Sequence, residues 1–157
     1  MGARRVRRAL IAVAGLAAVG GVAGLLLAQD VSSGRVTGGD ALAGATLYAE
    51  NCASCHGADL EGQPDWRTPG PDGRHPAPPH DETGHTWHHG DAMIFAYTKQ
   101  GGAEALAAAG VEGFDSGMPA FDDILTDQEI RDIMAFIKST WPERIRDAQA
   151  ARTADER

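Results

Sequence analysis

The chain has 157 residues, 14 basic and 22 acidic side chains, and a formal net charge of −8 at pH 7. The chain from residue 29 onward carries 10 of the basic and all 22 of the acidic side chains, a net charge of −12. This acidic excess excludes nucleic acid and anionic surfaces as partners. It suits a partner protein with a basic docking patch, but the need for solubility alone would also explain it. The length is that of one small domain.

An uncharged stretch over residues 9–28 follows the arginine-rich segment Arg4–Arg8. As a helix it is about 30 Å long, enough to cross a bilayer, and the arginines place its N-terminus in the cytoplasm. The stretch is longer than the core of a signal peptide, and Leu26–Ala28 is a poor cleavage site. We therefore expect residues 1–28 to be a retained single-pass anchor in a bacterial inner membrane, with a cleaved, soluble periplasmic protein as the alternative. Residues 29–39, rich in Gly and Ser, predict a flexible linker.

A first helix is predicted over residues 41–51, because Asp40 is a favourable N-cap and Gly44, Leu47 and Tyr48 share one face. This helix leads directly into the pentapeptide Cys52–His56, which contains the only two cysteines of the chain.

The pentapeptide has the form Cys-x-x-Cys-His, the attachment sequence of c-type haem. Two thiols one helical turn apart can add to the vinyl groups of one porphyrin, and His56 can then bind the iron through a neutral imidazole. A thioredoxin-like pair needs a βαβ context, a zinc site needs more ligands, and a disulfide leaves the histidine unexplained. We therefore predict one covalent haem c, attached through Cys52 and Cys55, with His56 as proximal ligand.

A long segment without periodicity, residues 62–90, contains six of the eight prolines and five of the six histidines. We expect it to wrap the haem edge, with Trp66, Arg67, Trp87 and the histidines as candidate donors to the propionates. The histidines could instead bind copper or zinc, or one could replace a methionine ligand, but the prolines and the irregular spacing disfavour a metal site. These histidines are His75, His80, His85, His88 and His89.

Two short helices are predicted next, over residues 92–100 with Asp91 as N-cap, and over residues 103–109. A capping box formed by Thr126 and Glu129 opens the last core helix, which extends to Thr140. The apolar stripe of this helix consists of Ile130, Ile133, Met134, Ile137 and Trp141. Pro142 interrupts the helix, and the charged residues 142–157 predict a frayed, solvated helical tail.

Met118 is the candidate for the second axial ligand. The other two methionines after the motif, Met93 and Met134, lie in predicted helices at positions suited to packing. Met118 lies in the loop 113–121 and precedes Pro119, which favours an extended backbone that can hold the side chain in place. Its soft thioether would favour ferrous iron and raise the reduction potential.

Three segments resemble the class I, mono-haem cytochromes c: Tyr48–Gly57, Gly117–Phe121 and the final helix ending in IMAFIKSTW. The resemblance covers about residues 40–141 and implies an all-α cytochrome c fold of three to five short helices around one haem. It also implies His56 and Met118 as axial ligands. The segment 62–90 is longer and richer in His and Pro than a minimal member needs.

These features predict an electron carrier rather than an enzyme, because an iron with both axial positions filled by the protein cannot bind a substrate. The carrier would pass single electrons between respiratory-chain proteins on the periplasmic side of the membrane. Two alternatives stay open: a haem subunit of a larger oxidoreductase, and a haem enzyme or gas sensor with a displaceable sixth ligand. Stoichiometric co-purification of partners would favour the first, and carbon monoxide binding at neutral pH the second.

Overall fold

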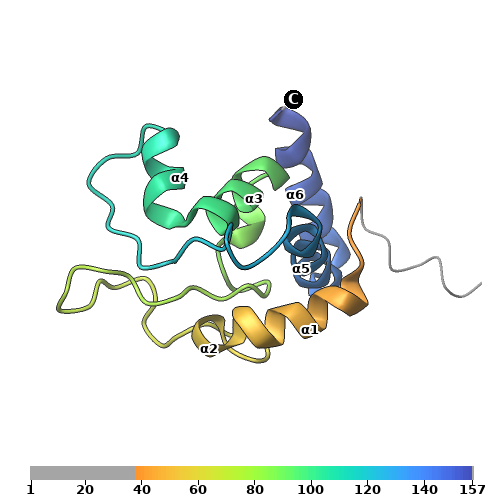
Figure 1. Ribbon diagram of the computed structural model, residues 1–157, viewed down its shortest axis with the longest axis horizontal. Coiled ribbons are helices and arrows are strands. Elements are labelled where there is room, and N and C mark those ends of the chain that lie inside the picture. The colour runs from red at the N-terminus through yellow and green to blue at the C-terminus, as the bar shows by residue number, and fades with distance from the viewer. Residues whose placement is uncertain (1–37, 157) are drawn as a thin grey trace, which may run out of the picture. The chain divides into compact units, whose positions relative to one another are not determined.

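The computed structural model describes residues 38–156, which form an all-helical domain with no strand among them (Figure 1). The predicted fold class is thus confirmed for this part of the chain, with six α-helices instead of three to five. The helices are α1 (Ala41–Asn51), α2 (Ala53–His56), α3 (Asp91–Gln100), α4 (Gly102–Ala108), α5 (Asp127–Thr140) and α6 (Glu143–Asp155), and a 3-10 helix, η1, spans Thr86–His88.

The predicted anchor over residues 1–28 and most of the linker lie outside the described residues. Between residues 38 and 156, no helix combines the length and the apolar character that a membrane crossing requires. The last two linker residues, Gly38 and Gly39, lie against α5: the Gly38 carbonyl accepts a 2.9 Å hydrogen bond from Gln128, and Gly39 is buried.

Helices α1 and α5 form the central packing of the domain (Figure 1). Asp40 caps α1 as predicted, since its carboxylate accepts hydrogen bonds from the amides of Leu42 and Ala43 at 2.9 and 3.3 Å. Gly44 and Tyr48 are buried on the face of α1 that meets α5. A Cβ atom at Gly44 would overlap the Asp132 carbonyl, so only glycine permits this close approach.

Helix α5 begins with the predicted capping box, in which the Thr126 amide donates to the Glu129 carboxylate at 2.7 Å. The residues of its predicted apolar stripe are all buried: Ile130, Ile133, Met134, Ile137 and Trp141. These side chains belong to one hydrophobic core that also contains Tyr48 of α1 and Cys52 of the haem motif.

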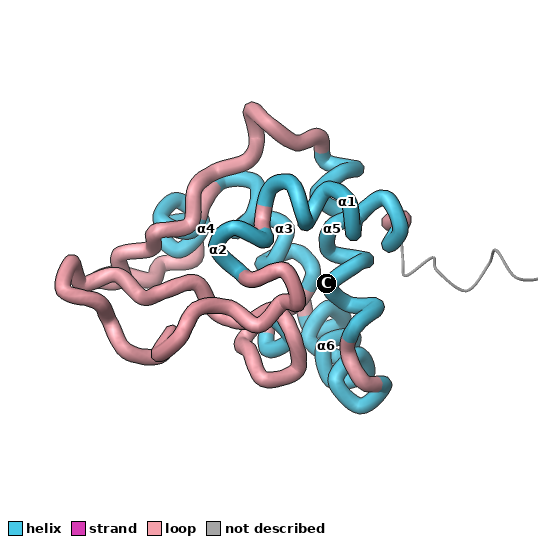
Figure 2. The backbone as a smooth tube through the Cα atoms, turned by 90° about the horizontal axis from the view of Figure 1, so that it is seen from below, coloured by secondary structure: helices cyan, strands magenta, loops and turns pink. Residues whose placement is uncertain are grey.

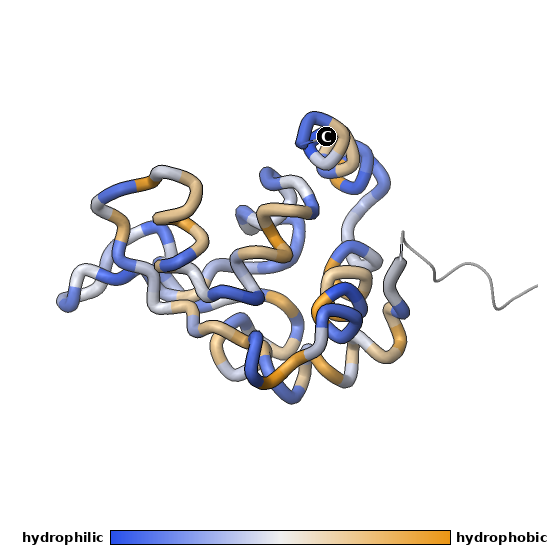
Figure 3. Tube along the Cα trace, turned by 45° about the horizontal axis from the view of Figure 1, so that its top comes forward, coloured by the Kyte–Doolittle hydropathy of each residue, from blue (hydrophilic) through white to orange (hydrophobic). Residues whose placement is uncertain are grey.

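The C-terminal tail differs from its prediction. It is an ordered helix, α6, although most of its residues are hydrophilic (Figure 3). Two residues four apart, Ile145 and Gln149, are 3% and 0% exposed and dock this helix on the domain. The prediction of a solvated helix is confirmed, since most residues of α6 are exposed, but the prediction of fraying is wrong. One buried residue in each of two successive turns, one apolar and one polar, leaves little hydrophobic periodicity in the sequence.

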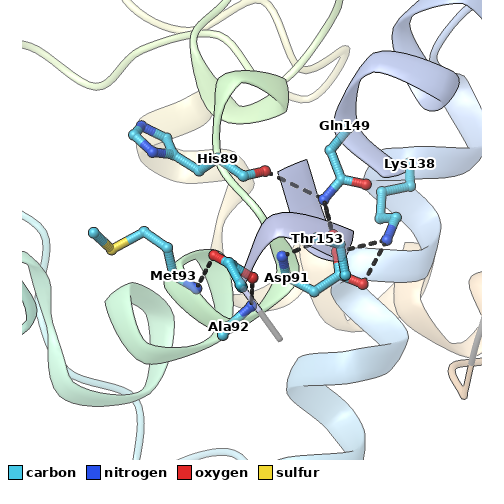
Figure 4. Close-up of polar contacts among 8 residues, drawn as sticks. His89, Asp91, Ala92, Met93, Lys138, Gln149 and Thr153 are labelled. Atoms are coloured by element: carbon cyan, nitrogen blue, oxygen red, sulfur yellow. Dashed lines mark hydrogen bonds and ion pairs between the residues drawn. The ribbon is translucent and has the colours of Figure 1, made fainter. Parts of the chain in front are cut away.

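The start of α3 explains how the tail is held. The helix begins at Asp91 with Gly90 as N-cap, so the prediction of Asp91 as N-cap is wrong. The Asp91 carboxylate instead accepts from Lys138 at 2.6 and 2.9 Å and from Gln149 at 2.7 Å (Figure 4). The free amides of the first turn of α3 are bonded by Glu156, at the end of α6.

Much of the two long connections, between α2 and α3 and between α4 and α5, lies away from α6, although the η1 part of the first connection contacts α6 (Figure 2). They contact each other through an ion pair of Arg74 with Asp115 at 3.1 Å and through stacked rings of His75 and Phe114, with centroids 5.3 Å apart. The segment 62–90 therefore contacts the loop that carries Met118.

Candidate haem site

The cysteines of the haem motif lie one turn apart around the single-turn helix α2. The amides of Cys55 and His56 both donate to the Cys52 carbonyl, at 3.1 and 2.9 Å. Both cysteines are free thiols; Cys52 is buried at the core and Cys55 is exposed. This spacing suits two thioether links to one porphyrin.

The acidity of Cys52 argues against a redox dithiol. Burial, and to a smaller extent the neighbouring Cys55, raises the pKa of the Cys52 thiol to about 11. Reactive cysteines in Cys-x-x-Cys pairs have lowered pKa values that populate the thiolate near neutral pH. Cys52 therefore lacks the lowered pKa that an attacking thiol in such a pair has.

His56 presents one ring nitrogen for metal binding. The residue is 7% exposed, and its Nδ1 lies 2.8 Å from the Pro78 carbonyl oxygen. A carbonyl can only accept, so Nδ1 carries the proton and Nε2 keeps its lone pair. Burial lowers the pKa of His56, an effect that outweighs the opposing hydrogen bond to Pro78, and the ring is neutral at pH 7. Neutral imidazole with its second nitrogen bonded to a carbonyl is the usual state of a metal-binding histidine.

Met118 lies at the edge of the same hydrophobic core to which Cys52 belongs. Its carbonyl accepts from the Gly102 amide at 3.0 Å, and its own amide donates to Ser116 Oγ at 3.3 Å. The Ser116 hydroxyl is in turn 2.8 Å from the hydroxyl of Tyr97 on α3. Helices α3 and α4 thus hold a methionine that sequence alone places in a loop. Of the other two candidates, Met134 is buried in the core as predicted.

His80 is a half-buried residue that the sequence did not single out among the histidines of the segment. Its ring stacks on His56, with centroids 4.0 Å apart and planes 24° from parallel, and its edge faces Tyr48. Burial, and secondly the neighbouring His56, lowers the pKa of His80 well below its ordinary value. In the sequence, His80 differs from the other histidines only by following Pro78 by two residues. That position predicts proximity to His56 only once the contact between Pro78 and His56 is known.

The other histidines of the segment 62–90 form ring contacts with one another and with nearby aromatic residues. The His85 ring lies 5.1 Å from His88 and 4.8 Å from His89. Within residues 38–156, no three His, Cys, Asp or Glu side chains are grouped so that they could hold a metal ion. The alternative of a second metal site thus gains no support from the described residues.

Two of the three non-histidine candidates for propionate contacts, Arg67 and Trp87, form hydrogen bonds within the segment itself. Trp87 Nε1 donates to the Glu82 carbonyl at 3.2 Å, and Arg67 donates to the Thr83 carbonyl at 3.4 Å. The Arg67 guanidinium also lies over the Trp66 ring, 4.1 Å from its centroid.

Free thiols one turn apart, an imidazole with Nε2 available, and a thioether at the same core are a donor set that fits covalently bound haem. A comparison with protein-family models matches the family described as Cytochrome c to residues 41–141. Searches of curated proteins and of solved structures gave no match.

Proposed function

The chain belongs to the cytochrome c family, whose members carry covalent haem c, and from this premise we propose that it is a mono-haem carrier of single electrons with His56 and Met118 as axial ligands. The attachment residues are Cys52 and Cys55. The observation that carries the proposal is the 2.8 Å contact of His56 Nδ1 with the Pro78 carbonyl, because it leaves Nε2 as the nitrogen that can bind metal.

When bound, haem c supplies an iron that is reduced and reoxidised by one electron. His56 contributes a neutral imidazole whose direction is fixed by Pro78. Met118 contributes a soft thioether, which favours the ferrous state and closes the position where a substrate or a gas would enter. Because α3 and α4 anchor the Met118 backbone, we expect little rearrangement between the two oxidation states.

We propose that the carrier works on the periplasmic side of a bacterial inner membrane, tethered by residues 1–28, and exchanges electrons with respiratory-chain proteins. The support is the arginine-rich segment before the uncharged stretch, together with a haem motif that follows it. Tethering would raise the local concentration of the domain near membrane-bound partners. The net charge of −12 from residue 29 onward suits partners with a basic docking patch.

Voltammetry of the haem-loaded chain under nitrogen and under carbon monoxide tests the carrier function. We expect one reversible one-electron wave whose midpoint is unchanged by carbon monoxide at neutral pH. Met118→Ala should bind carbon monoxide and shift its midpoint upward in the presence of the gas, whereas Met93→Ala should behave as wild type. A gas-dependent midpoint in the wild type would favour the enzyme or gas-sensor alternative.

Fractionation of cells that express the full chain tests the location. We expect the haem domain in the membrane fraction, cleaved by protease added to spheroplasts but not to intact cells. Recovery of the haem domain in the soluble periplasmic fraction would favour cleavage of the N-terminal segment, and recovery in the cytoplasm would refute the proposed location.

A further inference from the structure

The segment 78–80 makes two different contacts with the same imidazole. The Pro78 carbonyl accepts the Nδ1 hydrogen of His56, and two residues later the His80 ring lies flat against the His56 ring at 4.0 Å. One contact acts at the edge of the His56 ring and the other on its face. Because the His56 ring is held at its edge by Pro78 and on its face by His80, it has little freedom to rotate about the axis along which Nε2 points.

His80 is itself fixed on several sides. Its backbone amide donates to the Leu60 carbonyl at 2.8 Å, and its carbonyl accepts from Trp141 Nε1 at 2.7 Å. Its ring Nδ1 lies 2.7 Å from the hydroxyl of Thr86. The backbone contacts set the position of the residue, and the Thr86 contact sets the rotation of its ring.

The choice of residue type is informative. Burying an imidazole costs free energy unless its polar atoms are bonded, whereas an aliphatic side chain would fill an apolar interior without that cost. Here the chain uses an imidazole together with a hydroxyl that bonds it. A flat ring held at a set angle is the property that an aliphatic side chain in the same place would lack.

We propose that His80 is a positioning residue that sets the plane of the His56 ring about its bond to the iron, an inference that rests on the proposed ligand role of His56. The orientation of an axial imidazole determines which iron orbital holds the unpaired electron of the ferric state. The His80 stack and the Pro78 hydrogen bond together select one orientation.

The test uses the haem-loaded full chain in its ferric state. The paramagnetic shifts of the four haem methyl groups, read by proton NMR, follow the orientation of the axial imidazole plane. His80→Phe keeps a flat ring on His56 but loses the bond to Thr86, so its shift pattern should change as in Thr86→Val and by less than in His80→Leu. His80→Leu removes the stack and Thr86→Val releases the His80 ring, so both should change the order or the spread of the four shifts. His75→Leu, which removes a ring stacked on Phe114, is the matched control and should leave the pattern unchanged.

Wild-type shifts in both His80→Leu and Thr86→Val would overturn the positioning role. If His80→Leu does not fold, Thr86→Val and His80→Phe decide alone: altered patterns in both support the role, and any other pair of results refutes it. His56→Ala separates the two proposals. A wild-type low-spin spectrum in that variant would show that His56 is not the ligand, whereas loss of that spectrum with wild-type shifts in His80→Leu would refute the positioning role alone.

Discussion

The ion pair of Asp91 on α3 with Lys138 on α5 allows a quantitative prediction of a change in the free energy of unfolding. Asp91 also bonds Gln149, so it joins α6 to the core. Replacing Asp91 by alanine removes the carboxylate that accepts from Lys138 at 2.6 Å and from Gln149 at 2.7 Å (Figure 4). The Lys138 side chain is 10% exposed and the Asp91 side chain 29% exposed. The substitution therefore leaves an ammonium group largely buried without its counter-charge.

Removing one partner of a buried pair costs about 3–5 kcal/mol, mainly because the remaining charge is unpaired. The partial exposure of Asp91 lets water reach the site, so we expect a value near the lower end. Asp91 is also the first residue of α3, where its interaction with the helix dipole contributes about 0.5 kcal/mol. The expected loss is about 3 kcal/mol, or roughly 10 °C in Tm for a domain of this size.

Denaturant unfolding of the haem-loaded protein measures this loss. Asp115→Ala is the matched control, because it breaks an ion pair whose side chains are 53% and 56% exposed and should scarcely move the unfolding midpoint. Adding Lys138→Met to Asp91→Ala removes the orphaned charge and should restore most of the lost stability. The reasoning is refuted if Asp91→Ala costs no more than Asp115→Ala, or if the second substitution restores nothing.

Three further substitutions test contacts elsewhere in the fold. Gly44→Ala should gain about 1 kcal/mol in helix propensity but lose more through overlap with the α5 backbone, a net loss of about 2 kcal/mol by denaturant unfolding; equal or greater stability would contradict the close crossing. Hydrogen bonds from Thr126 lower the pKa of Glu129 below its ordinary 4.5, so the stability that it contributes is present above pH 4.5 and is lost as the pH falls through the lowered pKa. Glu129→Gln should therefore destabilise the domain at neutral pH and converge with wild type in acid, and a pH-independent difference would oppose this view. Glu156→Ala should cost about 1 kcal/mol by removing the bonds to the first amides of α3, with faster hydrogen exchange at those amides as the direct readout.

The parts of the fold that the sequence predicts well are those in which local chemistry and packing agree. Asp40 and Thr126 are N-caps whose side chains bond the next free amides, which requires no knowledge of the remaining chain. The apolar stripe of α5 repeats with the helical period, so its buried face can be read directly. The haem motif is equally local, since its three reactive residues lie within five positions.

The parts that the sequence does not predict depend on contacts between distant residues. The role of Asp91 is set by Lys138 and Gln149, 47 and 58 positions away, and no local pattern connects them. The position of His80 against His56 depends on Trp141, 61 positions away, and on a segment without periodicity. Among five histidines of similar surroundings in sequence, only the folded chain distinguishes the one that stacks on His56.

Ligation of the iron by His56 and Met118 is tested most directly by the optical spectrum of the ferric protein. We predict a weak long-wavelength band from charge transfer between the methionine sulfur and the iron. The band should be lost in Met118→Ala and kept in Met93→Ala and Met134→Leu. Absence of the band from the wild type, or its survival in Met118→Ala, would contradict the proposed pair of axial ligands.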